Sequence, residues 1–465
     1  MQRHFEKRKQ QLLADCKVSV KVFAKVTDRL DEFATPFVSN LWRPEQRQHA
    51  QTYLEGLMSD LDQKNSESIA YRHDQDRQGL QHFIGSSSWD HRPLIEELVR
   101  QIATELGEAD GVLVFDPSGF PKQGRDSVGV KRQWIGRLGK VDNGQVGIYM
   151  GYVSRKEHAL VDMRLYLPEE WAKDLKRRKK CGVPREIRYQ TRHELALEML
   201  SEHGPRLPHA WVTGDDEMGR PQWFREALQE KGERYLLAVP SNTLIRDLDG
   251  KKPDYGGRGR KPERRFERAE KWRGALAEKA WTQVTVRDGE KGPLSLEIVT
   301  CRVVAKTEKR RVGAPELLIL TRTKQEGGTF KQDSYLSNAP ADTPLEELAR
   351  VVKAEHEIEE CLERAKNESG LADYQVRTWP GWYHHQTLSL MAVWFLIQET
   401  LRGQQSTPAL TLPQVREGLA VILHEASGCA ALDRIARERT RRLQRNEMAR
   451  FYHWKKHNLL APLRI

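Results

Sequence analysis

Two aspartates could take part in chemistry because each follows a short apolar run that predicts a buried strand. Asp116 follows residues 112–115, which are bounded by Gly111 and by an Asp-Pro-Ser-Gly turn, and Asp215 follows residues 209–214. A carboxylate at the end of a buried strand is held by a rigid scaffold and stays open to solvent. The alternative for Asp116 is a plain turn cap, because Asp favours that position for its own backbone hydrogen bonds.

A third acid, Glu359, lies in a helical pattern with Lys366 seven residues further on. Seven residues are nearly two helical turns, so both side chains project from one face, although such a pair is commonly a solvated face. The three acids could converge on one point, but a chain with 66 acidic residues can also contain such a trio by chance. Oxygen-only ligands suit Mg²⁺ or Mn²⁺. Two such ions, about 3.5–4 Å apart, would support phosphodiester transfer, and Lys366 would add a positive charge near the phosphate.

The elements that would position these acids form an α/β core. A helix between two apolar strands predicts a βαβ unit with parallel pairing, and the run at 388–401 is apolar nearly all round, which predicts a buried central helix. The remaining patterns predict strands at 144–153, 159–167, 209–214 and 235–239, and helices at 191–203, 222–231 and 344–365.

The charge balance indicates a polyanionic partner. The 465 residues include 77 Lys and Arg against 66 Asp and Glu, a net charge of +11, and the pI is about 9.3. With 38% apolar residues the chain should form several folded domains, and nucleic acid is the leading candidate partner. Five separated cysteines support neither a disulfide framework nor a zinc knuckle, so we expect a reducing compartment. We expect an intracellular protein without membrane contact, because no apolar run reaches the length of a membrane span.

Composition divides the chain into five regions. Residues 1–106 have helical periodicity and basic polar faces. These faces could bind DNA phosphates, or they could simply be exposed to solvent. The core is expected at 107–240 and 316–402, interrupted by a β-rich insertion at 241–315 and followed by a basic helical region at 403–465. Residues 255–265 contain Arg-Gly-Arg without apolar periodicity, which predicts either a basic arm for an A·T-rich minor groove or an ordinary charged loop.

Five stretches carry a resemblance to a known family. They are FDPSGFPKQG, VKRQWIGRLGKVDNGQVGIYMGYVS, RLYLPEEWAKD, AWVTGDDEMGR with YLLAVPS, and IEECLERAKNESGLADYQVRTWPGWYHHQTLSLMAVWFL. In this order, over about residues 30 to 400, they resemble the bacterial insertion-sequence DDE transposases with an RNase H-like core.

The family motifs match the acids singled out above. Its first Asp follows the first core strand, as Asp116 does, and its second Asp stands four residues before the glycine of Asp-x-x-Tyr-Gly. Asp215 has that position, with Met218 in place of the usual Tyr. The third acid lies in a helix and is followed seven residues later by Lys, which matches Glu359 and Lys366.

The resemblance implies fold, activity and partners. The fold would be an RNase H-like mixed α/β sheet flanked by helices and interrupted by the β-rich insertion, with helical N-terminal and C-terminal regions. Asp116, Asp215 and Glu359 would hold two Mg²⁺ or Mn²⁺ ions for cleavage and strand transfer at terminal inverted repeats. The partners would be double-stranded transposon ends and target DNA, held by a homodimer in the bacterial cytoplasm, at the nucleoid. The residues expected to bind DNA are Lys122, Lys131, Arg132, Arg258, Arg260, Lys261, Arg264 and Arg265.

The chain departs from the family's Tyr-Arg-Glu-Lys signature. Val352 and Glu355 stand where Tyr and Arg precede the catalytic Glu, and His356 stands where Trp is frequent. An acid in place of a phosphate-binding base would repel the DNA backbone. Two further hypotheses therefore stay open: a domesticated DNA-binding protein that no longer cuts, and an RNase H-like nuclease without sequence preference. We expect His384 and His385 to be packed rather than to contact DNA.

Overall fold

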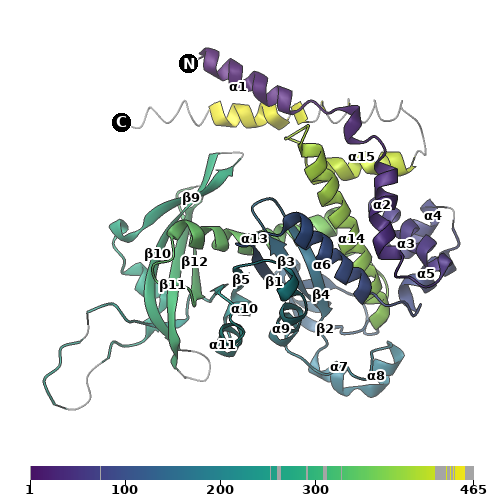
Figure 1. The fold of residues 1–465 in the computed structure, drawn as a ribbon. Helices are drawn as coiled ribbons and strands as arrows, with labels where there is room; N and C mark the ends of the chain where they lie inside the picture. Colours follow the sequence, from purple (N-terminus) through teal and green to yellow (C-terminus); the bar gives the residue numbers. More distant parts are fainter. Residues whose placement is uncertain are drawn as a thin grey trace.

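The computed structural model contains one large mixed sheet with helices around it (Figure 1). The described residues are 2–73, 75–251, 253–258, 263–289, 292–306, 312–325, 327–424, 436, 440, 443–444 and 446–455. Within them, twelve strands pair into a single continuous sheet. One part of the sheet belongs to the α/β core, and the other part belongs to the insertion expected from the sequence.

Five strands form the core of the sheet. In spatial order they are β4 (His158–Leu165), β3 (Lys140–Val153), β1 (Val112–Pro121), β5 (Trp211–Gly214) and β6 (Tyr235–Ala238). β3 runs antiparallel to both β1 and β4, whereas β1, β5 and β6 run parallel to one another. This order and these directions are those of an RNase H-like sheet, so the expected fold class is confirmed.

β1 is longer than the sequence predicts. We expected a strand that stops before Asp116, but β1 continues to Pro121. Its parallel partner β5 does end at Gly214, opposite Phe115, whereas its antiparallel partner β3 keeps pairing until Gly144 stands opposite Pro121. The sequence pattern fails here because turn-forming residues lie in a segment that a single neighbouring strand holds extended.

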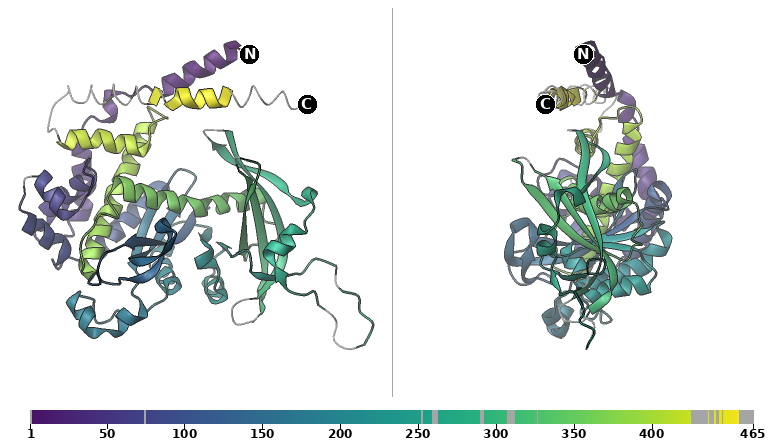
Figure 2. Two further views of the ribbon diagram at one scale, coloured as in Figure 1. Left: turned by 180° about the vertical axis from the view of Figure 1, so that it is seen from behind. Right: turned by 90° about the vertical axis from the view of Figure 1, so that its left-hand side faces the viewer.

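Helices cover both faces of the core (Figures 1 and 2). α13 (Leu345–Glu368) and α14 (Trp379–Gln404) lie on one face, and α6 (Arg92–Leu106) and α9 (Arg192–His203) lie on the other. α11 (Gln222–Glu230) connects β5 to β6, which completes the predicted βαβ unit. α14 is buried along almost its whole length, as its apolar character predicts. Among the described helices, none combines the length and hydropathy that a membrane crossing needs.

The N-terminal region is helical, as predicted, and packs on α14. Its helices are α1 (Gln2–Asp15), α2 (Val26–Val38), α3 (Pro44–Leu57), α4 (Ser66–Arg72) and α5 (Arg77–Gly85). Apolar side chains of this region and of the core sheet belong to one continuous hydrophobic core. An ion pair reinforces the junction, because the Arg29 guanidinium donates two hydrogen bonds of 2.7 Å to the Glu399 carboxylate of α14.

The insertion extends the core sheet beyond β6 (Figure 2). It contains β7 (Leu244–Asp247), β8 (Glu267–Arg268), α12 (Ala269–Gly274), β9 (Thr282–Gly289), β10 (Gly292–Lys306), β11 (Val312–Lys324) and β12 (Phe330–Ser337). β12 pairs with β6, and the order continues through β11 and β10 to β7 and β8. The boundary expected between residues 315 and 316 falls inside β11. Antiparallel pairing keeps the chain in this sheet until Ser337, and the core resumes with α13.

Candidate active site

Asp116 and Asp215 lie at equivalent positions on neighbouring strands. In the parallel pairing of β1 with β5, Phe115 stands opposite Gly214, so each aspartate is the next residue along its own strand. Neighbouring strands lie about 4.8 Å apart, so the backbones of the two acids begin close together. Asp215 also caps the following short helix, α10 (Asp216–Gly219), because its Oδ1 accepts a hydrogen bond from the Met218 amide at 2.9 Å.

Helix α13 brings the third acid and the lysine to the same place. Glu359 and Lys366 both lie on this helix, and their seven-residue spacing puts them on one of its faces. Lys366 Nζ donates a hydrogen bond of 2.8 Å to Oγ of Ser118, which lies two residues after Asp116 on β1. Residues two apart on a strand face the same side of a sheet, so Lys366 lies on the side to which Asp116 points.

The charges of these residues act on one another. Burial raises the pKa of Asp116 well above its ordinary value, and the negative charges of Asp215 and Glu359 raise it further, while Lys366 lowers it. Burial raises the pKa of Asp215 to about 7, although the hydrogen bond from the Met218 amide opposes the rise. Burial lowers the pKa of Lys366, and the charge of Asp116 partly offsets this. The site therefore carries an excess of negative charge, which a bound divalent cation would relieve.

A fourth acid, Glu355, belongs to this group. It lies one helical turn before Glu359 on α13 and is only 8% exposed. Its negative charge raises the pKa of both Asp116 and Asp215, and its Oε2 lies 2.7 Å from Nδ1 of His356. From the family signature we expected this acid to repel DNA phosphate, but its burial among the other acids makes it a candidate ligand. The four-residue spacing to Glu359 is the pattern that could have indicated this.

The donor set fits a hard divalent cation by its chemistry, because all the candidate ligand atoms are carboxylate oxygens. These oxygens do not form a closed cage. In the described part of the chain, the sets of three ligand atoms that lie within 4.8 Å of one another are found elsewhere. They are formed by His158, Glu357 and Glu360, and by Asp162, Glu202 and His203.

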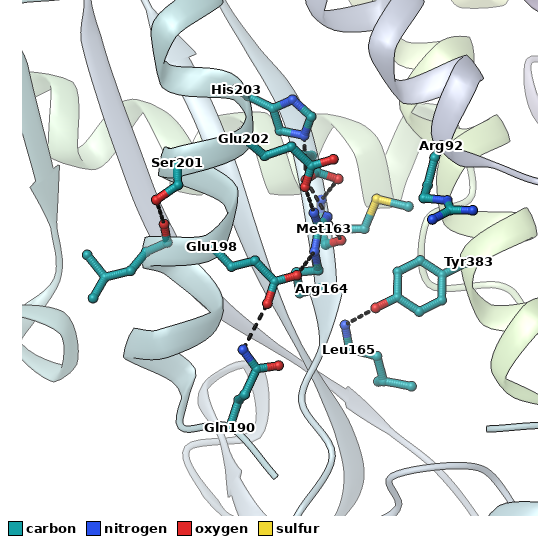
Figure 3. A network of polar contacts seen from close by, with 12 residues as sticks. Arg92, Met163, Arg164, Leu165, Gln190, Glu198, Ser201, Glu202, His203 and Tyr383 are labelled. Atoms are coloured by element: carbon teal, nitrogen blue, oxygen red, sulfur yellow. Dashed lines mark hydrogen bonds and ion pairs between the residues drawn. The ribbon is translucent and has the colours of Figure 1, made fainter. Parts of the chain in front are cut away.

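The Asp162 group lies on the face of the sheet opposite Asp116, because Asp162 pairs with Met150 and Met150 pairs with Phe115. This group already has a cation, Arg164 (Figure 3). Asp162 is buried on β4, and its Oδ2 lies 3.0 Å from His203 Nε2. The Arg164 guanidinium pairs with Asp162 and donates a hydrogen bond of 2.5 Å to Glu202. Burial raises the pKa of Asp162, but Arg164 and His203 lower it by more, so the net shift is downward. We interpret this network as structural, because Arg164 supplies the positive charge that a metal would bring.

The His158 group is neutralised in a similar way. Nδ1 of His158 lies 3.3 Å from Glu357 and 3.1 Å from Glu157. The Arg364 guanidinium pairs with Glu157 at 3.0 Å and with Glu360 at 2.6 Å. These contacts join α13 to the hairpin between β3 and β4, on which His158 and Glu157 lie, so we interpret this group as a structural tie as well.

The basic residues expected to bind DNA differ in their availability. Lys122 is engaged within the protein, because its Nζ donates a hydrogen bond of 2.8 Å to the Tyr374 carbonyl and lies 3.3 Å from the centroid of the Tyr374 ring. Contrary to the prediction, these contacts keep the Lys122 ammonium group from binding a phosphate. Lys131 forms a surface ion pair of 2.8 Å with Glu170, and Arg132 is exposed. Both remain predicted DNA contacts.

In the described residues of the segment between β7 and β8, which contains the predicted basic arm, the chain extends away from the sheet (Figure 1). Arg258 and Arg265 are exposed on it, whereas Arg264 pairs with Asp247 of β7 and so helps to hold the base of the segment. Arg260 and Lys261 lie outside the described residues. A DNA contact through this arm remains a prediction.

His384 and His385 are packed inside the protein, as expected. Both nitrogens of His384 contact carbonyl oxygens, those of Ile84 and Trp89, at 2.9 Å. Nδ1 of His385 lies 2.9 Å from the Tyr53 hydroxyl. Burial lowers the pKa of His384 to about 4 and that of His385 to about 3, although the carbonyl contacts oppose the shift.

The chain is similar in sequence to a probable insertion-sequence transposase. The chain is 30% identical over 196 residues to a Microchaete diplosiphon protein named as a probable transposase for insertion sequence element IS701; the aligned part is 42% of this chain and 49% of that protein. The chain thus spans about half the length of this curated relative. A cryo-EM structure of the piggyBac transposase synaptic complex with hairpin DNA is similar at a TM-score of 0.40 and 10% identity, over 95% of this chain and 85% of that chain.

The match to a protein family is more extensive. Residues 36–293, more than half of the chain, match the family described as DDE superfamily endonuclease. The matched part includes Asp116 and Asp215 and ends before α13. The chain therefore belongs to the DDE superfamily endonucleases, which use divalent metal ions.

Proposed function

We propose that the protein is a transposase that cleaves DNA at the terminal inverted repeats of an insertion element and joins the cut ends to target DNA. The observation that supports this most is the grouping of Asp116, Asp215 and the α13 acids beside Lys366, on the side of the sheet to which Asp116 points. A probable insertion-sequence transposase among the relatives supports the choice of DNA ends as substrate.

Each residue of the site has a role in this proposal. Asp116, Asp215 and Glu359 hold two Mg²⁺ or Mn²⁺ ions, and Glu355 is a further ligand. When bound, such ions activate the attacking oxygen and stabilise the leaving oxygen of the phosphodiester, first with water and then with a 3′-hydroxyl as nucleophile. Lys366, held by Ser118, directs its ammonium group toward the phosphate and offsets part of the acids' charge.

The rest of the chain binds the polyanion in this proposal. The net charge of +11 favours double-stranded DNA, and the exposed Arg132, Arg258 and Arg265 together with Lys131 contact its phosphates. Residues 1–106 serve as a helical DNA-binding region, and two copies of the chain hold two element ends. This assembly works on the bacterial nucleoid, in the cytoplasm.

The experiment that tests the proposal is a cleavage assay on DNA that carries the flanks of the protein's own gene, with Mg²⁺ present. Wild-type protein should produce strand breaks at a defined inverted repeat. Asp116→Asn and Glu359→Gln should abolish the breaks and leave DNA binding intact, because each removes a metal ligand and leaves the basic surface unchanged. Glu346→Gln is the matched control, since Glu346 is an exposed acid in the first turn of the same helix.

Other outcomes would favour the other hypotheses. Sequence-specific binding without cleavage by the wild-type protein would indicate a domesticated DNA-binding protein, for which the acid at position 355 in place of a base is the supporting feature. Cleavage without preference for the repeat would indicate a general RNase H-like nuclease. Loss of binding together with cleavage in both acid variants would count against the proposed roles of Asp116 and Glu359.

A further inference from the structure

The hairpin formed by β2 (Lys131–Ile135) and the first residues of β3 exposes apolar side chains to solvent. Trp134 is 57% exposed, and Val141, its partner across the two strands, is 51% exposed. Leu138, in the tight turn between the strands, is 40% exposed. Exposed apolar groups that lie together mark contact surfaces.

This hairpin lies beside the acids of the candidate active site. Ile135 is buried against β1, where a Cβ built on Gly119 would lie 3.0 Å from the Ile135 Cδ1 atom. Gly119 is three residues after Asp116 on this strand and so faces the other side of the sheet. Trp134, which neighbours Ile135 on β2, therefore lies on the side of the sheet to which Asp116 points. At the tip of the hairpin, the positive charge of Arg137 contributes to lowering the pKa of Lys366, so the guanidinium lies within electrostatic range of the site's lysine.

The charged residues of the hairpin suit an anionic partner. Lys131 and Lys140 are paired on the surface, with Glu170 at 2.8 Å and with Asp142 at 3.0 Å. Arg132 and Arg137 form no ion pair within 4.0 Å among the residues that the structure describes, and both are exposed. Arg132 donates a hydrogen bond of 3.4 Å to the Val141 carbonyl, so two exposed guanidinium groups without a carboxylate partner lie on the same hairpin as the exposed indole.

We propose that this hairpin holds a nucleotide that is unpaired or unstacked next to the scissile phosphate of the DNA. Trp134 stacks on the base, Leu138 contacts its edge, and Arg132 and Arg137 bind the neighbouring phosphates. An aromatic face with nearby cations binds single-stranded nucleotides of any sequence, because every base has a π face and every linkage has a charge. The proposal rests on the proposed function, since it takes DNA as the substrate of the acid site.

The test compares two DNA probes in the Asp116→Asn background, so that cleavage does not interfere. One probe is a duplex with 2-aminopurine in a short unpaired terminus, and the other is the same duplex fully paired. The parent protein should bind the unpaired probe more tightly and change its 2-aminopurine fluorescence. Adding Trp134→Ala should weaken binding of the unpaired probe about tenfold, with little effect on the paired probe, and should remove the fluorescence change.

Two variants make the test selective. Trp134→Tyr keeps an aromatic face and should retain most of the preference for the unpaired probe. Trp223→Ala is the matched control, because Trp223 is 43% exposed on α11, where it packs edge-on against His193 and Phe224. An equal loss of affinity for both probes on Trp134→Ala would overturn the proposal. So would conversion of a DNA-free dimer to a monomer by Trp134→Ala, which would assign the surface to contact between copies.

The binding test and the cleavage assay can fail separately. If the wild-type protein binds the unpaired probe through Trp134 but never cuts, the hairpin inference stands and the transposase proposal falls. If the protein cuts at its repeat and Trp134→Ala has no selective effect on the unpaired probe, the transposase proposal stands and the hairpin inference falls.

Discussion

The raised pKa of Asp215 predicts that the metal-free protein loses stability as the pH rises, and that removal of this carboxylate restores it. The pKa is about 7 in the folded protein, against an ordinary value of 3.8. The folded state therefore holds this proton more tightly than the unfolded state. Its contribution to stability is complete below the ordinary pKa and is lost as the pH rises through the folded value. Asp215→Asn removes this dependence and keeps an oxygen that can accept the Met218 hydrogen bond.

The size of the effect follows from the shift. One pKa unit corresponds to about 1.4 kcal/mol, so the charged Asp215 lowers the free energy of unfolding by at most about 4 kcal/mol at pH 8. Between pH 5 and pH 8, the free energy of unfolding should fall by about 3 kcal/mol of this maximum. Asp215 is partly exposed, so water screens its charge, and a measured change of about 1–3 kcal/mol is expected.

The assay is urea unfolding of the wild-type protein and of Asp215→Asn at pH 5 and pH 8, with a chelator present. The free energy of unfolding of Asp215→Asn, relative to that of the wild-type protein, should rise by about 1–3 kcal/mol between pH 5 and pH 8. Added Mg²⁺ should remove most of this advantage at pH 8, because the bound cation stabilises the charged carboxylates of the wild-type protein. Glu346→Gln should show no such change. An advantage of the same size at pH 5 and pH 8 would refute the crowding of acids around Asp215.

Three further predictions concern single side chains. Glu355→Gln should weaken Mn²⁺ binding about tenfold, measured by electron paramagnetic resonance of the free ion; unchanged affinity would exclude Glu355 from the ligand set. Lys366→Met should slow DNA cleavage by about 100-fold in single-turnover assays and leave DNA affinity within about twofold, whereas an equal loss of both would make it a general DNA contact. Arg164→Met should lower the free energy of unfolding by about 3–5 kcal/mol, because it leaves buried Asp162 without its cation; cleavage per folded molecule should stay unchanged, and a specific loss of cleavage would contradict the structural role.

Local patterns were sufficient to predict most of the core. Burial selects apolar residues, so a buried element can be predicted from its own sequence. This holds for the apolar runs of β3, β4, β5 and β6 and for α14, which is apolar on all sides. The βαβ unit follows from the order of its elements, because a crossover helix forces parallel pairing. The packed state of His384 and His385 was also predictable, since they begin the most apolar helix of the chain.

The remaining features depend on contacts between distant residues. The extension of β1 past Asp116 is set by pairing with β3, which overrides a turn-forming sequence. Lys122 is held by Tyr374, about 250 residues away in the chain. Glu355 acts on Asp116 and Asp215, which follow two separate strands of the sheet. The sequence contains Trp134 within a basic run, but nothing local indicates that the hairpin lies beside the acids.

The central claim is that Asp116, Asp215 and the acids of α13 jointly bind divalent cations. The most direct test is anomalous diffraction at the manganese edge from crystals grown with Mn²⁺. We predict anomalous peaks about 2–2.5 Å from carboxylate oxygens of both Asp116 and Asp215, with Glu359 or Glu355 completing the ligands. Peaks only at the His158 or Asp162 groups, or no peak near Asp116 and Asp215 at saturating Mn²⁺, would contradict the account.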